Sequence, residues 1–274
     1  MVFSSITFLL YFLPITFLVY YLFAFSRPLQ NLWLVIASLL FYAWGEPIYV
    51  FLMLASITFN WLFGLMLMLI RKDNVKARRL VLIAACVLNL GMLGVFKYAG
   101  FVVETVNGIM ERPFLPYPNI VLPIGISFFT FQALSYVIDV YMGSAEPQKN
   151  LLDIALYVAF FPQLIAGPIV KYSAIAEQIK NRRTDLSMLT EGICRFSEGF
   201  CKKILIANNL AVVADTVFNL TKGGDTSIPV PMLLAWLGAV SYMFQLYYDF
   251  SAYSDMAIGL GLMFGFRFSE NFRY

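Results

Sequence analysis

A group of polar side chains interrupts an apolar stretch between residues 232 and 266 of the 274-residue chain. It contains two carboxylates six residues apart, Asp249 and Asp255. Because a charge at the centre of a bilayer costs about 2.5–3.5 kcal/mol on insertion scales, such residues need partners or water and indicate a functional site. The alternative is a short loop at the membrane surface between two helices. The predicted residues of a substrate tunnel here are Gln245, Asp249, Ser251, Tyr253, Ser254 and Asp255.

A second unusual segment lies between residues 151 and 170, where prolines break an apolar run of spanning length. Non-helical backbone at membrane depth is tolerated only where protein or a water-filled cavity satisfies it. We therefore expect a re-entrant segment that lines a cavity, rather than a full crossing. That interpretation keeps the basic residues of 171–183 on the cytoplasmic side. The residues that we expect to line the cavity are Pro162, Gln163, Gly167 and Pro168.

The chain has no residue that ordinarily titrates near neutral pH, and although an aspartate whose pKa is raised by burial could substitute in principle, nothing in the sequence argues for one. It has no histidine, and its lysines and tyrosines ordinarily titrate near 10. Cys194 and Cys201 are seven residues apart, which is roughly 10 Å along one helix and too far for a disulfide. No catalytic residue, metal site or bound cofactor is therefore predicted within these 274 residues.

The composition is that of a polytopic membrane protein. Hydrophobic residues make up 61% and charged residues 13%, with a mean hydropathy of +0.77, whereas soluble domains have about 25% charged residues. A net charge of +3 spread over many loops gives no nucleic-acid-binding face. The first 25 residues lack a basic n-region, so we expect a retained helix rather than a signal peptide. One membrane domain is predicted for residues 1–274.

The apolar segments and the charges between them predict an all-α fold. Five of the nine residues in 71–79 are basic, which places that loop in the cytoplasm and the N-terminus outside. With the re-entrant segment, about eight transmembrane or re-entrant helices are expected. The expected crossings are 3–25, 28–44, 48–70, 80–96, 121–141 and 204–220, with 232–266 as two helices or one bent pair.

Two further segments are expected to lie at the membrane surface. Residues 98–110 are short and polar for a crossing, and 186–203 are amphipathic. In the second, Glu191/Arg195 and Glu198/Lys202 form i, i+4 pairs. Lys202, Lys203 and the basic residues of 171–183 are expected to face the cytoplasm, against anionic lipid or the phosphate of an acyl donor. The loops 112–118 and 221–231 are expected outside and 143–150 inside, and Gly261 and Gly265 are expected to allow close helix packing in lipid.

Residues 245–259 read Gln-Leu-Tyr-Tyr-Asp-Phe-Ser-Ala-Tyr-Ser-Asp-Met-Ala-Ile-Gly. This long pattern resembles the membrane-bound O-acyltransferase family, and within it the bacterial members that acetylate alginate and those that transfer D-alanine to teichoic acids. Phe161–Ile169 and Leu122–Gln132 are similar to two other family elements. One departure is Ala252, where the family usually has glycine.

The resemblance implies acyl transfer, with acetyl the expected group and a hydroxyl of an extracytoplasmic polysaccharide such as alginate, or a relay protein, as acceptor. The donor would be acetyl-CoA or an acyl carrier, and the location the bacterial inner membrane. The family's catalytic histidine lies C-terminal to the 245–259 pattern. Since these 274 residues contain none, the resemblance implies the N-terminal portion of a longer enzyme, inactive by itself.

Two other classes of function remain open from the sequence. Broken apolar segments and intramembrane aspartates also suit a secondary transporter or channel component, although no internal repeat supports that class. A non-catalytic membrane scaffold from a truncated gene is the other alternative.

Overall fold

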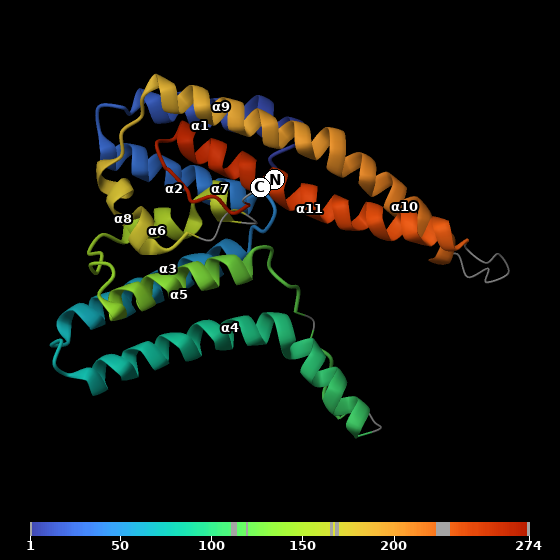
Figure 1. Cartoon of the computed structure of the whole chain (residues 1–274). Helices are drawn as coiled ribbons and strands as arrows, with labels where there is room; N and C mark the ends of the chain where they lie inside the picture. Colours follow the sequence, from blue (N-terminus) through green and yellow to red (C-terminus); the bar gives the residue numbers. More distant parts are fainter. Residues whose placement is uncertain are drawn as a thin grey trace. The chain divides into compact units, whose positions relative to one another are not determined.

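The computed structural model describes residues 2–110, 114–118, 120–164, 167, 170–222 and 231–272, and the secondary structure of these residues is helical, with no strand among them (Figure 1). The helices are α1 Leu13–Leu22, α2 Arg27–Ala43, α3 Tyr49–Leu69, α4 Val75–Ile109, α5 Ile126–Met142, α6 Leu151–Ala159, α7 Phe161–Leu164, α8 Tyr172–Asn181, α9 Leu186–Cys201, α10 Asn208–Lys222 and α11 Met232–Met263, with π-helical turns η1 Phe8–Phe12 and η2 Lys202–Ala207.

The all-α prediction is confirmed, but the predicted number of about eight membrane-inserted helices is not. Within the described residues, three helices are long and apolar enough to cross a membrane: Tyr49–Leu69, Val75–Ile109 and Leu186–Leu220. The chain divides into two compact units, one mainly of residues 16–182 and the other mainly of residues 2–15 and 183–274. The single membrane domain over 1–274 stays a prediction.

In the first unit, α2 and α3 form the predicted helical hairpin around Gly45–Pro47. Further along the first unit, α5 begins at Ile126, later than the predicted residue 121. The delay follows from Pro123 and from Gly125, whose φ of 77° is the left-handed conformation that glycine adopts without strain. The loops 112–118 and 221–231 contain residues outside the described ranges.

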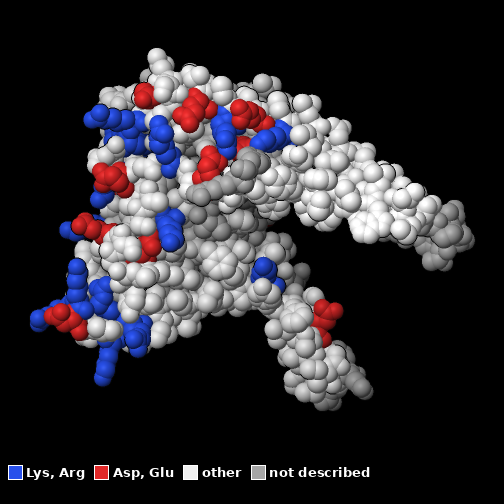
Figure 2. Space-filling model, in the orientation of Figure 1, with Lys and Arg blue, Asp and Glu red and all other residues white. Residues whose placement is uncertain are grey.

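Arg78 joins the ends of three helices in the first unit. It lies in the first turn of α4, and its guanidinium donates to the carbonyl oxygens of Leu67 at 2.9 Å and Tyr141 at 3.1 Å. These carbonyls belong to the last turns of α3 and α5, where backbone oxygens have no partner inside the helix. Figure 2 shows a dense group of Lys and Arg side chains over the end of α3 and the start of α4. One residue of the basic loop region therefore also has a structural role.

The second half of α4 corrects the prediction of a separate surface helix at 98–110. The helix runs without interruption over 35 residues, Val75–Ile109. Gly94 and Gly100 flank residue 97, but neither has the positive φ of a capping glycine. No proline lies between them, and Lys97 is a good helix former. The chain leaves this helix only at Met110.

The second unit contains two more helices that are longer than predicted. α9, η2 and α10 follow one another directly from Leu186 to Lys222, so the predicted boundary at residue 203 is wrong. A π-helical turn, Lys202–Ala207, stands where the break was expected. α11 is one helix of 32 residues rather than two helices. α9 and α10 run alongside α11 (Figure 1).

Candidate functional site

The six polar residues predicted on 245–255 all lie on α11, so the alternative of a loop between two helices is excluded. Asp255 is the most enclosed acid of the group, with a side chain that is 4% exposed, while the side chain of Asp249 is 43% exposed. The two carboxylates therefore lie in different surroundings. Asp255 needs compensation from the protein, whereas Asp249 is partly accessible.

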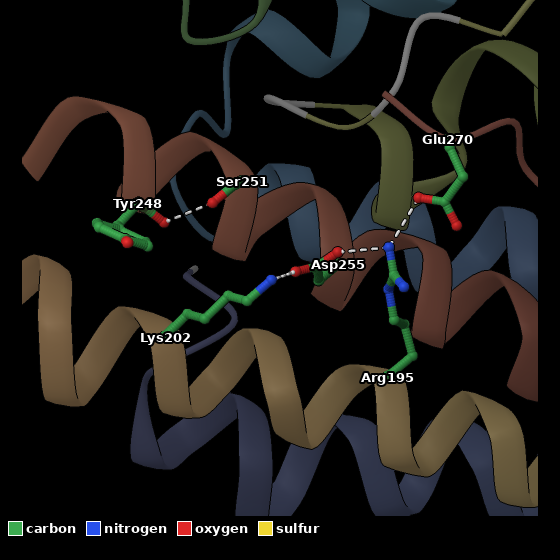
Figure 3. A network of polar contacts seen from close by, with 6 residues as sticks. All are labelled: Arg195, Lys202, Tyr248, Ser251, Asp255 and Glu270. Atoms are coloured by element: carbon green, nitrogen blue, oxygen red, sulfur yellow. Dashed lines mark hydrogen bonds and ion pairs between the residues drawn. The ribbon is translucent and has the colours of Figure 1, made fainter. Parts of the chain in front are cut away.

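Both carboxylate oxygens of Asp255 contact cations from α9 and η2 (Figure 3). Oδ1 lies 2.8 Å from Nη2 of Arg195, and Oδ2 lies 2.7 Å from Nζ of Lys202. Charge-assisted contacts of this length are about twice as strong as neutral hydrogen bonds. The arrangement confirms the expectation that the aspartates on this segment have partners. It also fixes Asp255 as an acceptor whose two oxygens are already engaged.

Arg195 makes a second ion pair, with Glu270 at 2.7 Å. Glu270 follows α11, and the chain must reverse to bring it there (Figure 3). The reversal is a Schellman motif: Phe266 N–H donates to the Gly261 carbonyl at 2.8 Å and Gly265 N–H to the Leu262 carbonyl at 3.0 Å. Gly265 has a φ of 84°, as this motif requires.

The role expected for the two glycines near the end of α11 is therefore corrected. Gly265 ends α11, and Gly261 makes room for a side chain of the returning segment. A Cβ on Gly261 would lie 2.6 Å from the ring of Phe268. Both glycines thus serve the turn that carries Glu270 to Arg195, rather than a helix–helix contact in lipid.

The remaining ion pair of this network joins Lys203 to Asp249. Lys202 and Lys203 are consecutive residues in the π-helical turn η2, and they reach two aspartates that are six residues apart on α11. The predicted i, i+4 pairs on 186–203 are thus replaced by contacts between helices. Arg195 and Lys202 both contact the buried Asp255 on α11. A buried carboxylate attracts a cation more strongly than an exposed glutamate one turn away on the same helix. Figure 2 shows charged side chains over α9, whereas the visible face of the α10–α11 end is uncharged.

α9 and α11 approach closely because small residues face each other. A Cβ on Gly192 would lie 2.7 Å from the carbonyl oxygen of Gly259, and a Cβ on Gly259 would lie 2.6 Å from that of Gly192. Seven residues along, a Cβ on Gly199 would lie 2.6 Å from the carbonyl oxygen of Ala252. The backbones therefore touch, which places Arg195 and Lys202 within reach of Asp255.

The other predicted polar residues of α11 do not join the ion pairs. Ser251 Oγ contacts the Tyr248 carbonyl at 3.4 Å, and the Tyr253 ring stacks on Phe3 with centroids 4.6 Å apart. Gln245 Oε1 and Ser254 Oγ are buried and have no hydrogen-bond partner within the described part of the chain. Buried oxygens without a partner are uncommon in proteins, so these two atoms are candidates to contact a bound molecule.

The proline-containing segment is broken as predicted, and the structure shows how its backbone is satisfied. α6 ends at Ala159, and the N–H of Phe161 donates to Ser38 Oγ at 3.1 Å instead of to a helix carbonyl. The Tyr157 carbonyl accepts from Nε2 of Gln132 at 2.7 Å and of Gln163 at 2.6 Å.

Pro162 and Gln163 are buried in the first unit, and Gly167 is also buried. Pro168 lies outside the described residues. The interactions of Gln163 show a structural role at the helix break. Whether any of these residues lines a tunnel stays a prediction.

A small cavity of about 210 Å³ lies beside Arg195 in the second unit. Its other lining residues come from α9, from α11 and from the returning segment: Glu191, Cys194, Glu198, Ile258, Leu262 and Glu270. Within the described residues, no group of His, Cys, Asp and Glu side chains is placed to hold a metal ion. The cavity therefore presents carboxylates around one shared guanidinium.

Arg195 and Glu270 are members of the network that the sequence did not single out as site residues. The signal that could have identified Arg195 was the expected burial of Asp255, because a carboxylate inside a membrane needs a cationic partner. The nearest basic residues in an amphipathic segment were Arg195 and Lys202, and the i, i+4 rule assigned both to neighbours on their own helix. Glu270 gives no local signal, because its position depends on the turn at Gly265.

Comparison with known proteins gives a consistent result along the chain. Residues 145–274 match the model of the membrane-bound O-acyltransferase family. All of the chain aligns at 46% identity with a probable alginate O-acetylase of Pseudomonas syringae pv. tomato, over 51% of that protein. The same identity and coverage of this chain are found with a probable alginate O-acetylase of Pseudomonas putida, over 55% of its length.

A more distant relative is a peptidoglycan O-acetyltransferase of Helicobacter pylori, 36% identical over 99% of this chain and 56% of the relative. The chain thus spans about half the length of these relatives. The resemblance drawn from the 245–259 pattern is confirmed, since that pattern lies inside the matched region. Residues 145–274 carry the match to the membrane-bound O-acyltransferase family, and the residues before them align with the same relatives.

Proposed function

We propose that this chain forms part of a membrane-bound O-acyltransferase that moves an acetyl group to a hydroxyl of an extracytoplasmic polysaccharide. The observation that carries the proposal is the 245–259 pattern on α11, whose buried Asp255 is held by Arg195 and Lys202 inside the region that matches the family. The names of the relatives, which include alginate and peptidoglycan O-acetyltransferases, support acetyl as the group and a polysaccharide as the acceptor.

The ion pairs define what α11 contributes. Because both oxygens of Asp255 contact cations, Asp255 positions groups rather than accepting the proton of an attacking hydroxyl. The family's histidine is the expected proton acceptor, and these 274 residues do not contain one. Gln245 Oε1 and Ser254 Oγ are the atoms of α11 proposed to contact the acyl group or its acceptor.

The finer features are proposals of the same kind. The protein would lie in the bacterial inner membrane with its N-terminus outside, because the basic residues of 71–79 favour the cytoplasm. The donor is proposed to be acetyl-CoA or an acyl carrier on the cytoplasmic side. The acceptor is proposed to be alginate or a related polymer, reached directly or through a periplasmic relay protein.

Complementation tests the proposal. The complete protein is produced in an alginate-forming bacterium from which the native alginate O-acetylase gene has been deleted, and the acetyl ester content of the polymer is measured. Restored acetylation supports the proposal. An unacetylated polymer, with the protein present in the membrane at the native level, contradicts the choice of acceptor. Peptidoglycan acetylation in a matching deletion strain then decides whether another polysaccharide is the acceptor.

A further inference from the structure

A cavity in the first unit is lined by residues of α2, α6 and α8. Its volume is about 280 Å³. Two cations, Arg27 and Lys180, belong to its lining. The other lining residues are Pro28, Asn31, Asn150, Leu152, Asp153 and Ile179.

Arg27 is held in a defined orientation. Its Nη1 donates to Gln30 Oε1 at 2.8 Å, and Gln30 Nε2 donates to the Tyr20 carbonyl at 3.1 Å. Gln30 is buried, so this support is rigid. A guanidinium with one edge fixed in this way keeps other N–H groups for an anion, in the fork geometry that matches phosphate oxygens.

The negative charge of Asp153 in the cavity is partly offset by the buried Arg182, which reaches it through Asn31. Asp153 Oδ1 accepts from Asn31 Nδ2 at 3.3 Å, and Asn31 Oδ1 accepts from Nη1 of Arg182 at 2.6 Å. Burial lowers the pKa of the Arg182 guanidinium, while Tyr20 and Asp153 act in the opposite direction. The positive charge of Arg182 thus offsets Asp153 through Asn31. Lys180 also acts on Asp153. Three cations, Arg27, Lys180 and Arg182, thus surround one carboxylate, and the net charge at the cavity stays positive.

The backbone at the start of α6 also adds positive electrostatic potential to the cavity. Asn150 caps α6, a helix of nine residues, by accepting from the Leu152 N–H at 3.0 Å, and both residues line the cavity. The N-terminal end of a helix carries a partial positive charge that favours anions. The cavity therefore combines a net positive charge, the oriented guanidinium of Arg27 and the N-terminus of α6.

We infer that this cavity binds a phosphate group through Arg27 and Lys180. Its volume is slightly below the 300–1,000 Å³ typical of sites for drug-sized ligands, so a single phosphate-bearing head fits it better than a whole nucleotide. The phosphate comes either from an anionic lipid head group or from the phosphorylated end of a soluble molecule. Such a site would bind phosphate whether or not the protein transfers acyl groups.

The test measures binding to the complete protein, with three variants that each remove one positive charge. Arg27→Gln and Lys180→Gln change the cavity. Lys171→Gln is the matched control, because Lys171 is exposed at the opposite end of α8 and does not line the cavity. In the lipid arm, the protein is purified from mixed micelles of phosphatidylglycerol and phosphatidylcholine, and the retained lipid is quantified by native mass spectrometry. In the soluble arm, pyrophosphate is titrated against the protein in phosphatidylcholine nanodiscs.

For a lipid site, wild type and Lys171→Gln retain phosphatidylglycerol over phosphatidylcholine, and each cavity variant retains about tenfold less, as expected for the loss of one charge-assisted hydrogen bond. For a soluble phosphate, retention is equal in all four proteins, and pyrophosphate binds wild type and Lys171→Gln about tenfold more tightly than the cavity variants. The inference is overturned if neither probe distinguishes the cavity variants from Lys171→Gln.

Discussion

Gly199 on α9 lies directly against the backbone of α11 at Ala252, so close that a Cβ on Gly199 would lie 2.6 Å from the Ala252 carbonyl oxygen. The methyl group of Ala252 is fully buried, so it is accommodated without opening the pair. Close contact between α9 and α11 therefore depends on Gly199 in this protein.

Replacing Gly199 with alanine is expected to push α9 away from α11 and to lower the free energy of unfolding by about 1–3 kcal/mol, as for other overpacking changes. The gain of about 1 kcal/mol that alanine brings to a helix interior offsets only part of the cost of overpacking. Gly94→Ala is the control, because a Cβ there has no neighbour within 4 Å. Denaturant unfolding of both variants in the same detergent measures the difference. Equal stability of Gly199→Ala and Gly94→Ala would disprove the close contact.

Arg195→Gln removes the cation shared by Asp255 and Glu270. Lys202 still contacts Asp255, so the expected loss is that of charged hydrogen bonds, about 1.5–3 kcal/mol, rather than that of a fully unpaired charge. The returning segment loses its tether at Glu270, and limited proteolysis after Gly265 should become faster. Arg71→Gln serves as the control, since Arg71 and Asp73 are 88% exposed. Unchanged stability and unchanged cleavage in Arg195→Gln would show that Arg195 does not hold the segment with Glu270 against α9.

The α3–α4 contact in the first unit depends on a reciprocal pair of amides. Asn60 Nδ2 donates to Asn89 Oδ1 at 3.0 Å, and Asn89 Nδ2 donates to Asn60 Oδ1 at 2.9 Å, with both residues buried. Asn60→Leu is expected to cost about 0.6–2 kcal/mol, the range measured for hydrogen bonds between membrane helices.

Because Asn60→Leu leaves Asn89 with an unmatched amide, the double change Asn60→Leu/Asn89→Leu should cost less than the sum of the two single changes. Unfolding of the four proteins in a double-mutant cycle gives this coupling directly. Strictly additive costs would mean that the two amides do not interact.

Local signals in the sequence predicted the local features of the fold. The α2–α3 hairpin, the end of α5 at Gly143 and the break at Phe160, two residues before Pro162, each depend on residues within a few positions of the feature. The boundaries predicted near residues 97 and 203 failed because polar residues alone do not end a helix. Lys97, Lys202 and Lys203 are all compatible with helical backbone.

The candidate site was predicted in part. The sequence identified the polar residues of α11, because carboxylates in an apolar stretch can be recognised without knowing their partners. The pairing of Asp255 with Arg195 was not predictable, because it joins residues from two helices whose approach depends on Gly192, Gly199 and Gly259. Local rules pair each charge with a neighbour on its own helix, whereas the packing of α9 against α11 pairs Arg195 with Asp255.

The most direct measurement is the acetyl ester content of alginate in the deletion strain that carries the complete protein, either as wild type or with Asp255→Asn or Asp249→Asn. Asp255→Asn keeps the shape of the side chain but removes the charge that Arg195 and Lys202 contact. At equal amounts of protein in the membrane, wild type should restore acetylation, Asp255→Asn should lose it, and Asp249→Asn, whose carboxylate is 43% exposed, should retain most of it. Wild-type acetylation by Asp255→Asn would contradict a role for the buried ion pairs of α11 in acyl transfer.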